Sequence, residues 1–486
     1  MGEGAAVVIG LDLGTSRCKA VALSGAGRVI ARTARPHRAG LSQRGEQDPE
    51  KVWDGARQSL RKLAAELGQG EPAAAISLSG AMHTLLPVEE DGTPLAGAMT
   101  WADVRAAAEA GVGNGAARYR RTGCPPQPIY HPARLRWWAR QAPEVMRRAD
   151  RFVALKDWVL HRLAGSWVTD LGLASTTGLL DIHRLVWDEE SLEVSGITSE
   201  RLPGLVDATA HVGGLTARGA DELGLPPGLP VLAGSSDGGL ANLGAGAVGA
   251  GQVVLSLGTS GAVRKVVDDP WLDDHQRTWC YALSPGHWFA GGAINNGGLA
   301  VQWVRETLYP GPVPDAAYRR LLVEAAEVPA GAEGLVVLPE FVPERGREGR
   351  GEGASLHRLD LRHRRRHVAR AALESIAMSL AEIADVLGLA EQQPVRLTGA
   401  FSQASVWSQV LSDVLGRPVV ALRDGDASAQ GAAIMGHRAL GNLSSLDQAA
   451  ELVQVREPVH PHPGRHQRYR ELRHQVAELR ARLDPG

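Results

Sequence analysis

The chain has 486 residues, several times the length of a small single domain, so we expect two or more domains that each bury a core. Its 52 basic and 54 acidic side chains nearly cancel, and this balance argues against a nucleic-acid-binding protein. The three cysteines lie far apart and form no zinc-type pair, a pattern typical of a reducing cytoplasm. Neither a membrane-spanning apolar run nor a secretory leader pattern is present, so we expect a cytoplasmic protein without a membrane partner.

One strand–turn–strand pattern occurs in both halves of the chain. The apolar run 7–13 ends in a Gly-Thr-Ser turn and returns as a second apolar run at 18–23. Residues 252–267 repeat this arrangement around a second Gly-Thr-Ser turn. The repeat predicts two equivalent domains.

Helices and strands alternate through the rest of the chain. Periodicity predicts helices at 50–67, 133–148, 367–387, 404–415 and from 469 onward, strands at 74–78, 231–233 and 394–397, and loops at 125–132 and 343–370. This alternation favours α/β domains with partly parallel sheets. The Gly- and Ala-rich segment 244–251 marks the boundary, so we expect domains at 1–245 and 246–486.

The two turns have the composition of phosphate-binding loops. Their backbone N–H groups and hydroxyls could bind an anionic phosphate, and Lys19 adds a positive charge beside the first turn. Asp12, just before that turn, could hold a divalent cation through water. A single Gly-Thr-Ser turn is also common in simple hairpins. Two such turns, one opening each half, point instead to a nucleotide bound by two related domains.

A second candidate site lies at Gly234–Gly239, between a predicted strand and a helix expected from about Leu240. Small residues there would let a substrate approach Asp237, whose carboxylate could accept a proton from an attacking hydroxyl. The alternative is that Asp237 only caps the helix. Its position next to the predicted domain boundary favours the functional interpretation, because ligands often bind between domains.

These residues belong to a longer ordered series of motifs. The series comprises GLDLGTSRCKA at 10–20, Met82-His83, TWADVRA at 100–106, TGCPPQPIYHPARLRWW at 122–138, DLGLASTTGLLD at 170–181, GSSDGGLANLG at 234–244, LGTSGAVR at 257–264, GGAINNGGLAVQWVRE at 291–306, TGAFSQASVWSQVLSDVLGRPV at 398–419 and ASAQGAA at 427–433. Over nearly its full length the chain resembles the FGGY family of carbohydrate kinases. The sequences of its motifs are most similar to those of the gluconate-specific members.

The resemblance implies two actin-like (ribonuclease H-like) α/β domains with an active-site cleft between them. It also implies ATP-dependent transfer of a phosphoryl group to a terminal hydroxyl of a small sugar acid, with D-gluconate as the expected acceptor. By the same resemblance Asp237 is the catalytic base, and Asp12 and Asp237 hold Mg²⁺. A homodimer is a further expectation from the family.

The resemblance assigns nucleotide-binding residues by their match to the family's motifs. Those of the phosphate loops and the adenosine end are Asp12, Gly14, Thr15, Ser16, Lys19, Gly258, Thr259, Ser260, Gly298, Gln302, Gly399, Ala400 and Gln403. Asp426 and Ser428 are expected to support the adenosine end. Gln302 and Gln403 could instead be ordinary helix-surface residues.

On the acceptor side, Met82, His83, Trp101, Asp103 and Arg105 resemble the family's sugar-binding positions. A carboxylate on the acceptor needs a cationic partner, for which His83, Arg105 and Lys156 are the candidates, although Lys156 could equally be structural. Arg134 stands where the family signature has lysine.

One segment departs from the family pattern, and two alternative functions stay open. Residues 343–356 keep only Glu344-Arg345 and Arg350-Gly351 of the family's usual segment, which puts closure of the active site, affinity and acceptor identity in question.

Another sugar or polyol kinase, xylulokinase first, is the alternative within enzymes. A non-enzymatic, actin-like ATP-binding sensor is the other, but it would need no sugar-binding residues.

Overall fold

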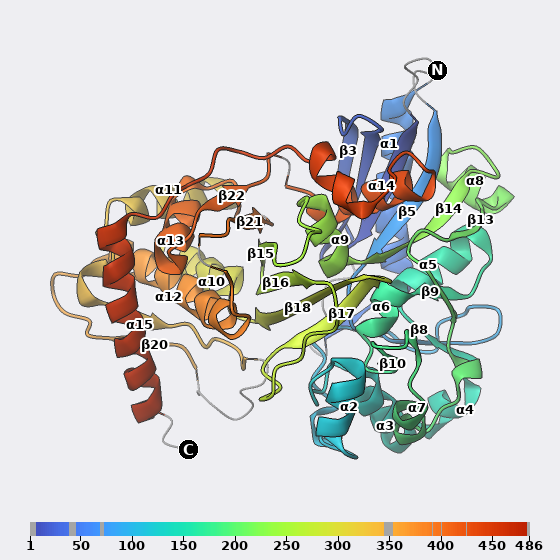
Figure 1. Cartoon of the computed structure of the whole chain (residues 1–486), viewed down its shortest axis with the longest axis horizontal. Coiled ribbons are helices and arrows are strands. Elements are labelled where there is room, and N and C mark those ends of the chain that lie inside the picture. The colour runs from blue at the N-terminus through green and yellow to red at the C-terminus, as the bar shows by residue number, and fades with distance from the viewer. Residues whose placement is uncertain are drawn as a thin grey trace. The chain divides into compact units, whose positions relative to one another are not determined.

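The structure is a computed structural model and describes residues 6–37, 45–68, 72–344, 353–390, 392–399, 401–423 and 425–483. The chain forms two compact units (Figure 1). The first comprises Met1–Ala250, Val266–Ala290 and Asp426–Val453, and the second comprises Gly251–Lys265, Gly291–Gly425 and Gln454–Gly486. A segment late in the sequence therefore folds with the N-terminal unit.

A mixed six-stranded sheet organises the first unit. Its strands, in the order β13-β14-β5-β1-β2-β3, are β13 (His211–Gly214), β14 (Pro230–Ser236), β5 (Ala73–Gly80), β1 (Val7–Leu13), β2 (Arg17–Ser24) and β3 (Val29–Pro36). β1 pairs antiparallel with β2 and parallel with β5, and β14 is parallel to β5. The parallel strands β1, β5 and β14 thus end at the same edge of the sheet.

Helices cover both faces of this sheet. Successive strand side chains point to opposite faces, so Ile9 packs in one buried cluster with α1 (Pro49–Leu67) and α5 (Leu155–Ala164), and Val8 packs in another with α9 (Asp237–Gly244) and α14 (Ala427–Ala439). The predicted helix at 50–67 is confirmed, and Asp48 caps it by accepting from the Glu50 N–H at 3.0 Å.

Further short elements complete the first unit. They are β4 (Glu46–Gln47), β6 (Leu86–Val88), β7 (Ala98–Met99), α2 (Gly115–Thr122), α3 (His131–Gln141), α4 (Pro143–Arg148), β8 (Arg151–Val153), β9 (Val168–Asp170), α6 (Leu171–Ser175), β10 (Leu180–Asp181), β11 (Val186–Trp187), α7 (Glu189–Ser195), β12 (Gly204–Val206), α8 (Ala217–Leu223) and β17 (Trp279–Ser284). The prediction of one helix over 133–148 is wrong. Pro143 cannot continue the preceding helix, so α3 ends at Gln141 and α4 begins at Pro143.

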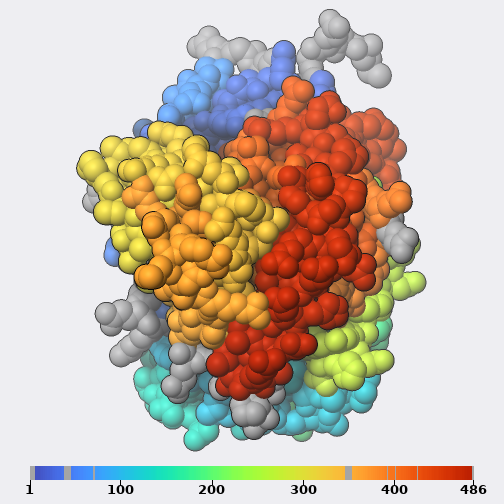
Figure 2. Space-filling view, turned by 90° about the vertical axis from the view of Figure 1, so that its left-hand side faces the viewer, coloured from blue at the N-terminus to red at the C-terminus, as the bar shows by residue number. Residues whose placement is uncertain are grey.

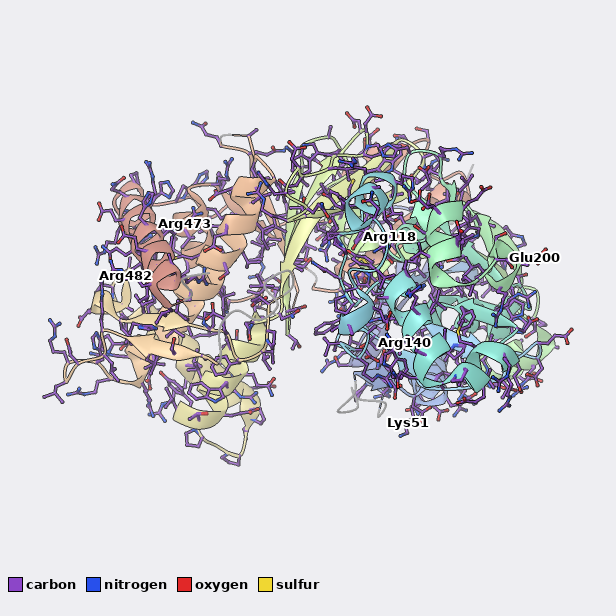
Figure 3. All side chains as sticks on the ribbon, turned by 90° about the horizontal axis from the view of Figure 1, so that it is seen from below. Lys51, Arg118, Arg140, Glu200, Arg473 and Arg482 are labelled. Atoms are coloured by element: carbon purple, nitrogen blue, oxygen red, sulfur yellow. The ribbon has the colours of Figure 1, made fainter. Side chains whose placement is uncertain are left out.

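Arg118 of α2 and Arg140 of α3, both labelled in Figure 3, bind residues of the segment 109–112. Arg118 is buried and donates to the carbonyls of Val112 at 3.0 Å and Ala110 at 3.4 Å, and burial lowers its pKa. Arg140 is mostly exposed and pairs with the buried carboxylate of Glu109. These arginines therefore serve packing and loop anchoring.

The second unit repeats the central arrangement of the first. β15 (Val253–Leu257) pairs antiparallel with β16 (Gly261–Val267) and parallel with β21 (Val395–Thr398), which is parallel to β22 (Val419–Ala421). A strand that returns antiparallel and is flanked by parallel strands is also the pattern of β2, β1, β5 and β14. The prediction of two equivalent α/β domains is therefore confirmed.

Among the residues that the structure describes, the α-helices of the second unit are α10 (Gly298–Leu308), α11 (Pro314–Ala326), α12 (Arg365–Val386), α13 (Ser405–Leu415) and α15 (Pro463–Leu483). The terminal helix α15 begins before the predicted residue 469 and lies on the surface of this unit (red in Figure 2). Its Tyr469 is fully buried and donates to Glu374 of α12 at 2.7 Å, while Arg370 donates to Tyr469 at 2.8 Å.

The remaining strands are β18 (His287–Ile294), β19 (Val336–Leu338) and β20 (Ser355–His357). β20 lies inside the segment 343–370 that was predicted to be a loop, and it pairs antiparallel with β19. Residues 345–352 of that segment lie outside the described residues. Over the ranges that the structure describes, no helix combines the length and apolarity needed to cross a membrane.

The buried imidazole of His131 predicts a loss of stability in acid. Its Nε2 donates to the Thr84 carbonyl at 3.1 Å, and burial lowers its pKa to about 3. Below pH 6.5 the imidazole of the unfolded chain binds a proton that folded His131 does not. The free energy of unfolding therefore decreases by about 1.4 kcal/mol for each pH unit by which the pH is lowered. His131→Gln keeps an amide donor but cannot titrate.

We therefore expect wild type to lose roughly 2 kcal/mol more than His131→Gln between pH 7.5 and pH 5.0. Urea unfolding of both proteins at the two pH values measures this difference. An identical pH dependence would show that His131 does not carry the acid sensitivity.

Candidate active site

Asp12 lies at the end of β1, between two strand neighbours that also carry polar side chains. Its register partners are Lys19 on β2 and Ser79 on β5, and Ser79 Oγ donates to Asp12 Oδ1 at 2.8 Å. Burial raises the pKa of Asp12 to about 6, Lys19 lowers it, and Asp237 raises it further. At neutral pH Asp12 is thus mainly a carboxylate, with one oxygen already accepting from Ser79.

The turn at Gly14–Ser16 is held by three side chains. His37 Nε2 donates to the Gly14 carbonyl at 2.8 Å and Gln47 Nε2 to the Thr15 carbonyl at 2.7 Å. The Trp101 indole N–H donates to Thr15 Oγ1 at 3.3 Å. The turn is therefore fixed on both its backbone and its threonine side chain. No sequence pattern indicated His37 or Gln47, because neither belongs to a recognisable motif.

Lys19 is held by an acidic residue from late in the sequence. Its Nζ lies 3.1 Å from Oδ1 of Asp426, the residue preceding α14. Two residues further, Ser428 Oγ donates to the Asp237 carbonyl at 3.1 Å. Both residues fold with the first unit, beside Lys19 and Asp237, and their expected support of the adenosine end stays a prediction. Sequence distance concealed this proximity.

Asp237 is the first residue of α9, and Ser236 caps the helix by accepting from the Gly239 N–H at 3.4 Å. The expected helix start near 240 is therefore wrong by one turn. The Met82 N–H donates to Asp237 Oδ1 at 3.4 Å. The structure thus brings the predicted base next to the first predicted acceptor-binding residue.

His83 has a left-handed backbone, with φ of 65°, which is uncommon for a residue with a side chain. Its Nδ1 donates to the Thr176 carbonyl at 2.9 Å, and its ring meets that of Tyr130 edge-on at 5.4 Å. Arg134, also fully buried, donates to the carbonyls of His83 and Thr100. Arg134 therefore links the two segments that carry the predicted acceptor-binding residues.

Asp103 and Arg105 bind each other. Arg105 Nε donates to Asp103 Oδ1 at 3.0 Å, and its Nη2 donates to Glu46 at 2.5 Å. Asp103 is 1% exposed, and the Arg105 guanidinium lies 4.6 Å from the Trp137 ring centre. An acceptor carboxylate that bound Arg105 would therefore compete with two acidic side chains.

Lys156, the third candidate for an acceptor carboxylate, is in the interior of the first unit. Its side chain is fully buried, and Nζ lies 2.9 Å from Asp170 Oδ1. The lysine is therefore already paired inside the unit, as the structural interpretation of Lys156 expects.

The second Gly-Thr-Ser turn adjoins the start of α10. The Gly298 N–H donates to the Gly258 carbonyl at 2.8 Å, and the Leu299 N–H to the Thr259 carbonyl at 3.0 Å. A Cβ on Gly298 would lie 2.4 Å from the Gly258 oxygen, so only glycine allows this approach. The Gly258 N–H donates to Ser260, which closes the turn. The structure thus brings these four predicted residues together.

The other nucleotide candidates of the second unit are on its helices and loops. Gln302 is exposed and donates to Glu306 of its own helix at 2.9 Å. Gln403 donates to the Leu422 carbonyl at 3.2 Å. Gly399 has φ of 97°, and a Cβ there would lie 2.2 Å from the Leu257 oxygen. Ala400 lies outside the described residues.

Glu344, inside the segment 343–356 that departs from the family pattern, is anchored to the loop that precedes α10. Its carboxylate accepts from the backbone N–H of Asn295 at 2.6 Å and of Asn296 at 3.1 Å. The Asn296 side chain donates to Glu344 at 2.7 Å as well. The glutamate that the sequence shares with the family pattern thus orders the approach to α10.

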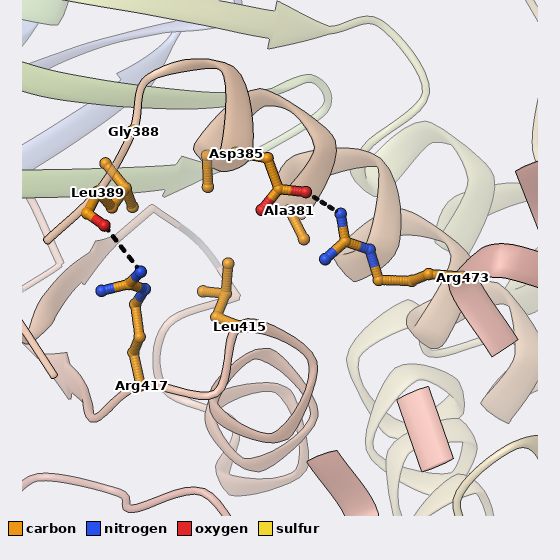
Figure 4. A pocket seen from close by; sticks show the side chains of 8 residues that line it. Ala381, Asp385, Gly388, Leu389, Leu415, Arg417 and Arg473 are labelled. Atoms are coloured by element: carbon orange, nitrogen blue, oxygen red, sulfur yellow. Dashed lines mark hydrogen bonds and ion pairs between the residues drawn. The ribbon is translucent and has the colours of Figure 1, made fainter. Parts of the chain in front are cut away.

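A separate pocket of about 220 Å³ lies near the end of α12 (Figure 4). Two arginines reach it: Arg473 pairs with Asp385, and Arg417 donates to the Leu389 carbonyl at 2.9 Å. The predicted site residues do not line this pocket. Within the described ranges, no three His, Cys, Asp or Glu residues are arranged to hold a metal ion by themselves.

Family comparisons agree with this geometry. The models of the FGGY family of carbohydrate kinases match residues 7–244 with the N-terminal domain and 253–440 with the C-terminal domain. The chain belongs to the FGGY family of carbohydrate kinases. It is therefore a phosphotransferase that acts on a sugar-type acceptor, and its two α/β units have the actin-like fold of these kinases.

Gluconate kinases and xylulose kinases are both among the proteins that this chain resembles. The gluconokinase of Bacillus licheniformis is 32% identical, over 92% of this chain and 90% of the relative. A gluconate kinase structure from Lactobacillus acidophilus has a TM-score of 0.90 at 28% identity, covering 99% of this chain and 98% of that one. A xylulose kinase structure from the same organism has a TM-score of 0.89 at 28% identity, covering 98% of both chains.

Proposed function

We propose that the chain transfers the γ-phosphoryl group of ATP to the terminal hydroxyl of D-gluconate, giving 6-phosphogluconate. The observation that carries the acceptor assignment is the 32% identity to a gluconokinase over nearly the full length of both chains. The arrangement around Asp237 supports the reaction type, because a carboxylate at the end of a parallel strand adjoins the residues expected to bind the acceptor.

Asp237 acts as the general base in this proposal. Its carboxylate accepts the proton of the acceptor hydroxyl as that oxygen attacks the phosphorus. The Met82 N–H and the helix α9, which begins at Asp237, fix the position of the carboxylate. Met82, His83 and Trp101 then orient the acceptor, so that proximity supplies much of the rate.

Both Gly-Thr-Ser turns bind phosphate oxygens in this proposal. The first turn is braced by His37, Gln47 and Trp101, and the second by its contacts with the start of α10. Such preorganised N–H and hydroxyl donors stabilise the charge of the transferring group without reorganising during the reaction. Lys19 adds a positive charge, and its ion pair with Asp426 restricts where that charge lies.

The residues present fit Mg²⁺. This ion keeps several waters and is usually held by one or two carboxylates together with substrate phosphates, so it needs no cluster of three protein ligands. Asp12 has a carboxylate oxygen beyond the one bonded to Ser79, and the influence of Asp237 on its pKa places a second carboxylate nearby. Asp12 and Asp237 would hold the ion. When bound, it would offset the charge of the phosphate oxygens.

The acid group of the acceptor has two remaining candidate partners. Lys156 is removed from the set by its buried pairing, which leaves His83 and Arg105. The guanidinium group of Arg105 already forms ion pairs with the carboxylates of Asp103 and Glu46. A neutral ketose would need no cationic partner, and the similarity to a xylulose kinase structure makes D-xylulose the second candidate acceptor.

The deciding experiment is a panel of acceptors. Purified protein with Mg²⁺ and ATP is given D-gluconate, D-xylulose, glycerol, L-ribulose or D-glucose, and ADP release is measured against a reaction without acceptor. We expect release well above that background with D-gluconate alone. Preferential release with D-xylulose would transfer the assignment to a ketose kinase, and release with none of the five would contradict the proposal.

The cytoplasm is the proposed location. Cys18, Cys124 and Cys280 are all buried and free, as is usual for proteins kept in a reducing compartment.

A further inference from the structure

A β-bulge in β14, at Ala233 and Gly234, is separated from Asp237 by two residues along the chain. Leu232 pairs with Ser77 and Ser235 with Ser79, so Ala233 and Gly234 together oppose the single residue Leu78. Gly234 has φ of 64°, and a Cβ there would lie 1.7 Å from the Leu78 oxygen. Bulges re-aim the side chains that follow them and are common beside active sites. This bulge therefore sets the direction in which the chain reaches Asp237.

Lys156 binds the carbonyl group that the bulge displaces. Its Nζ donates to the Ala233 carbonyl at 2.9 Å. The lysine comes from the first turn of α5, where it packs so tightly on the end of β5 that a Cβ on Gly80 would lie 2.5 Å from Lys156 Cβ. The ammonium group thus approaches the bulge from a rigid neighbouring element and not from a mobile loop.

Asp170 connects the same lysine to the residue after the bulge. Its Oδ1 lies 2.9 Å from Lys156 Nζ, and its Oδ2 accepts from Ser235 Oγ at 2.6 Å. Oδ2 also accepts from the Leu173 N–H at 2.9 Å and so caps α6. Asp157 is a second acidic neighbour of the lysine at 3.7 Å, but burial raises its pKa to about 7, which leaves Asp170 as the main counter-charge.

Because these groups are buried, each depends on its partner inside the protein. Lys156, Asp170 and Ser235 are each at most 1% exposed, so water cannot replace a lost partner. A buried ion pair contributes little net stability relative to an apolar pair of the same volume, whereas removal of one partner is costly. Stability therefore does not explain why these charged groups are buried beside β14, the strand that leads to Asp237. A role in fixing the geometry of that strand explains it better.

We propose that Lys156 is a positioning residue for Asp237, acting through the Ala233 carbonyl and, by way of Asp170, through the Ser235 hydroxyl. The proposal rests on the proposed role of Asp237 as the base. Both contacts fix backbone or side-chain atoms within four residues of that carboxylate. Since small misplacements of a reacting group cost orders of magnitude in rate, loosening these contacts slows turnover without removing any group that binds substrate.

Ser235→Ala is the central test, because it leaves the Lys156–Asp170 pair intact. Its matched control is Ser191→Ala: Ser191 is also fully buried and donates through Oγ to the helix-capping Asp188 at 2.5 Å, on α7. We expect similar shifts of the unfolding midpoint in the two variants. We expect kcat to fall about tenfold only in Ser235→Ala, with the KM values for ATP and acceptor within about threefold of wild type.

Lys156→Met is the stronger variant and should lower kcat by about 100-fold with the same KM pattern. If it fails to fold, Ser235→Ala and its control decide the matter. The positioning role is overturned if Ser235→Ala has the kcat of Ser191→Ala, or if folded Lys156→Met turns over like wild type.

Asp237→Asn, assayed in parallel with whichever acceptor the wild type phosphorylates, separates this inference from the proposed function. An inactive Asp237→Asn beside active Lys156 and Ser235 variants overturns the positioning role alone. A fully active Asp237→Asn overturns the base itself, and the positioning role with it.

Discussion

Asp237→Asn is expected to lower kcat for phosphoryl transfer by about 100- to 10,000-fold, the usual contribution of a positioned general base. Asparagine is nearly isosteric with aspartate, and its side-chain oxygen can still accept from the Met82 N–H. It cannot take a proton from the acceptor hydroxyl at neutral pH. The defect should therefore be in the chemical step.

Three measurements test this expectation together. Steady-state ADP release gives kcat, calorimetric titration with ATP gives nucleotide affinity, and thermal unfolding reports the fold. Asp221→Asn on the exposed surface of α8 is the matched control, and it should behave as wild type in all three. Wild-type turnover by Asp237→Asn would remove this carboxylate from the mechanism, whereas a collapse of the unfolding midpoint would assign it a structural role.

Most elements of the fold could be predicted from local sequence patterns. The two strand–turn–strand repeats, the glycine-rich segment at 234–239 and the helical periodicity at 50–67 are all local in sequence, and the structure contains the corresponding elements. Errors arose where a single residue outweighed periodicity. Pro143 divides a predicted helix, and Ser236 caps α9 earlier than the glycine pattern suggested.

The missed parts of the site depend on pairings between distant residues. Asp426 reaches Lys19 because the segment 426–453 folds into the first unit, and nothing in the sequence near residue 426 records that return. His37 and Gln47 brace the first turn through their side chains from segments without a motif. Lys156 shows the converse: its residue type suggested a ligand for an acid, but its burial and its carboxylate neighbours make it an internal ion-pair partner.

We expect the largest effect on stability from Gly431→Ala, a substitution in α14, the late helix that folds into the first unit. A Cβ on Gly431 would lie 1.9 Å from the Leu240 carbonyl oxygen of α9, and a Cβ on Gly244 of α9 would lie 1.9 Å from the Ala427 oxygen of α14. The two helices therefore touch backbone to backbone. Gly431→Ala must push them apart, and since backbone atoms cannot rotate away we expect a loss of more than about 3 kcal/mol.

Gly464→Ala in α15 is the matched control, because its Cβ would meet only the His462 ring at 3.5 Å. There, the higher helix propensity of alanine should leave stability within about 1 kcal/mol of wild type. Urea unfolding of both variants measures the contrast, and equal midpoints would show that the α9–α14 contact has room to relax.

The same substitution should also reach the chemistry. Ser428, on α14, donates to the Asp237 carbonyl, and Asp426, just before that helix, pairs with Lys19. A displaced α14 would loosen both groups at once. Any Gly431→Ala protein that remains folded at low temperature should therefore show a lower kcat than Gly464→Ala, and equal kcat values would separate the packing of α14 from the positions of Asp237 and Lys19.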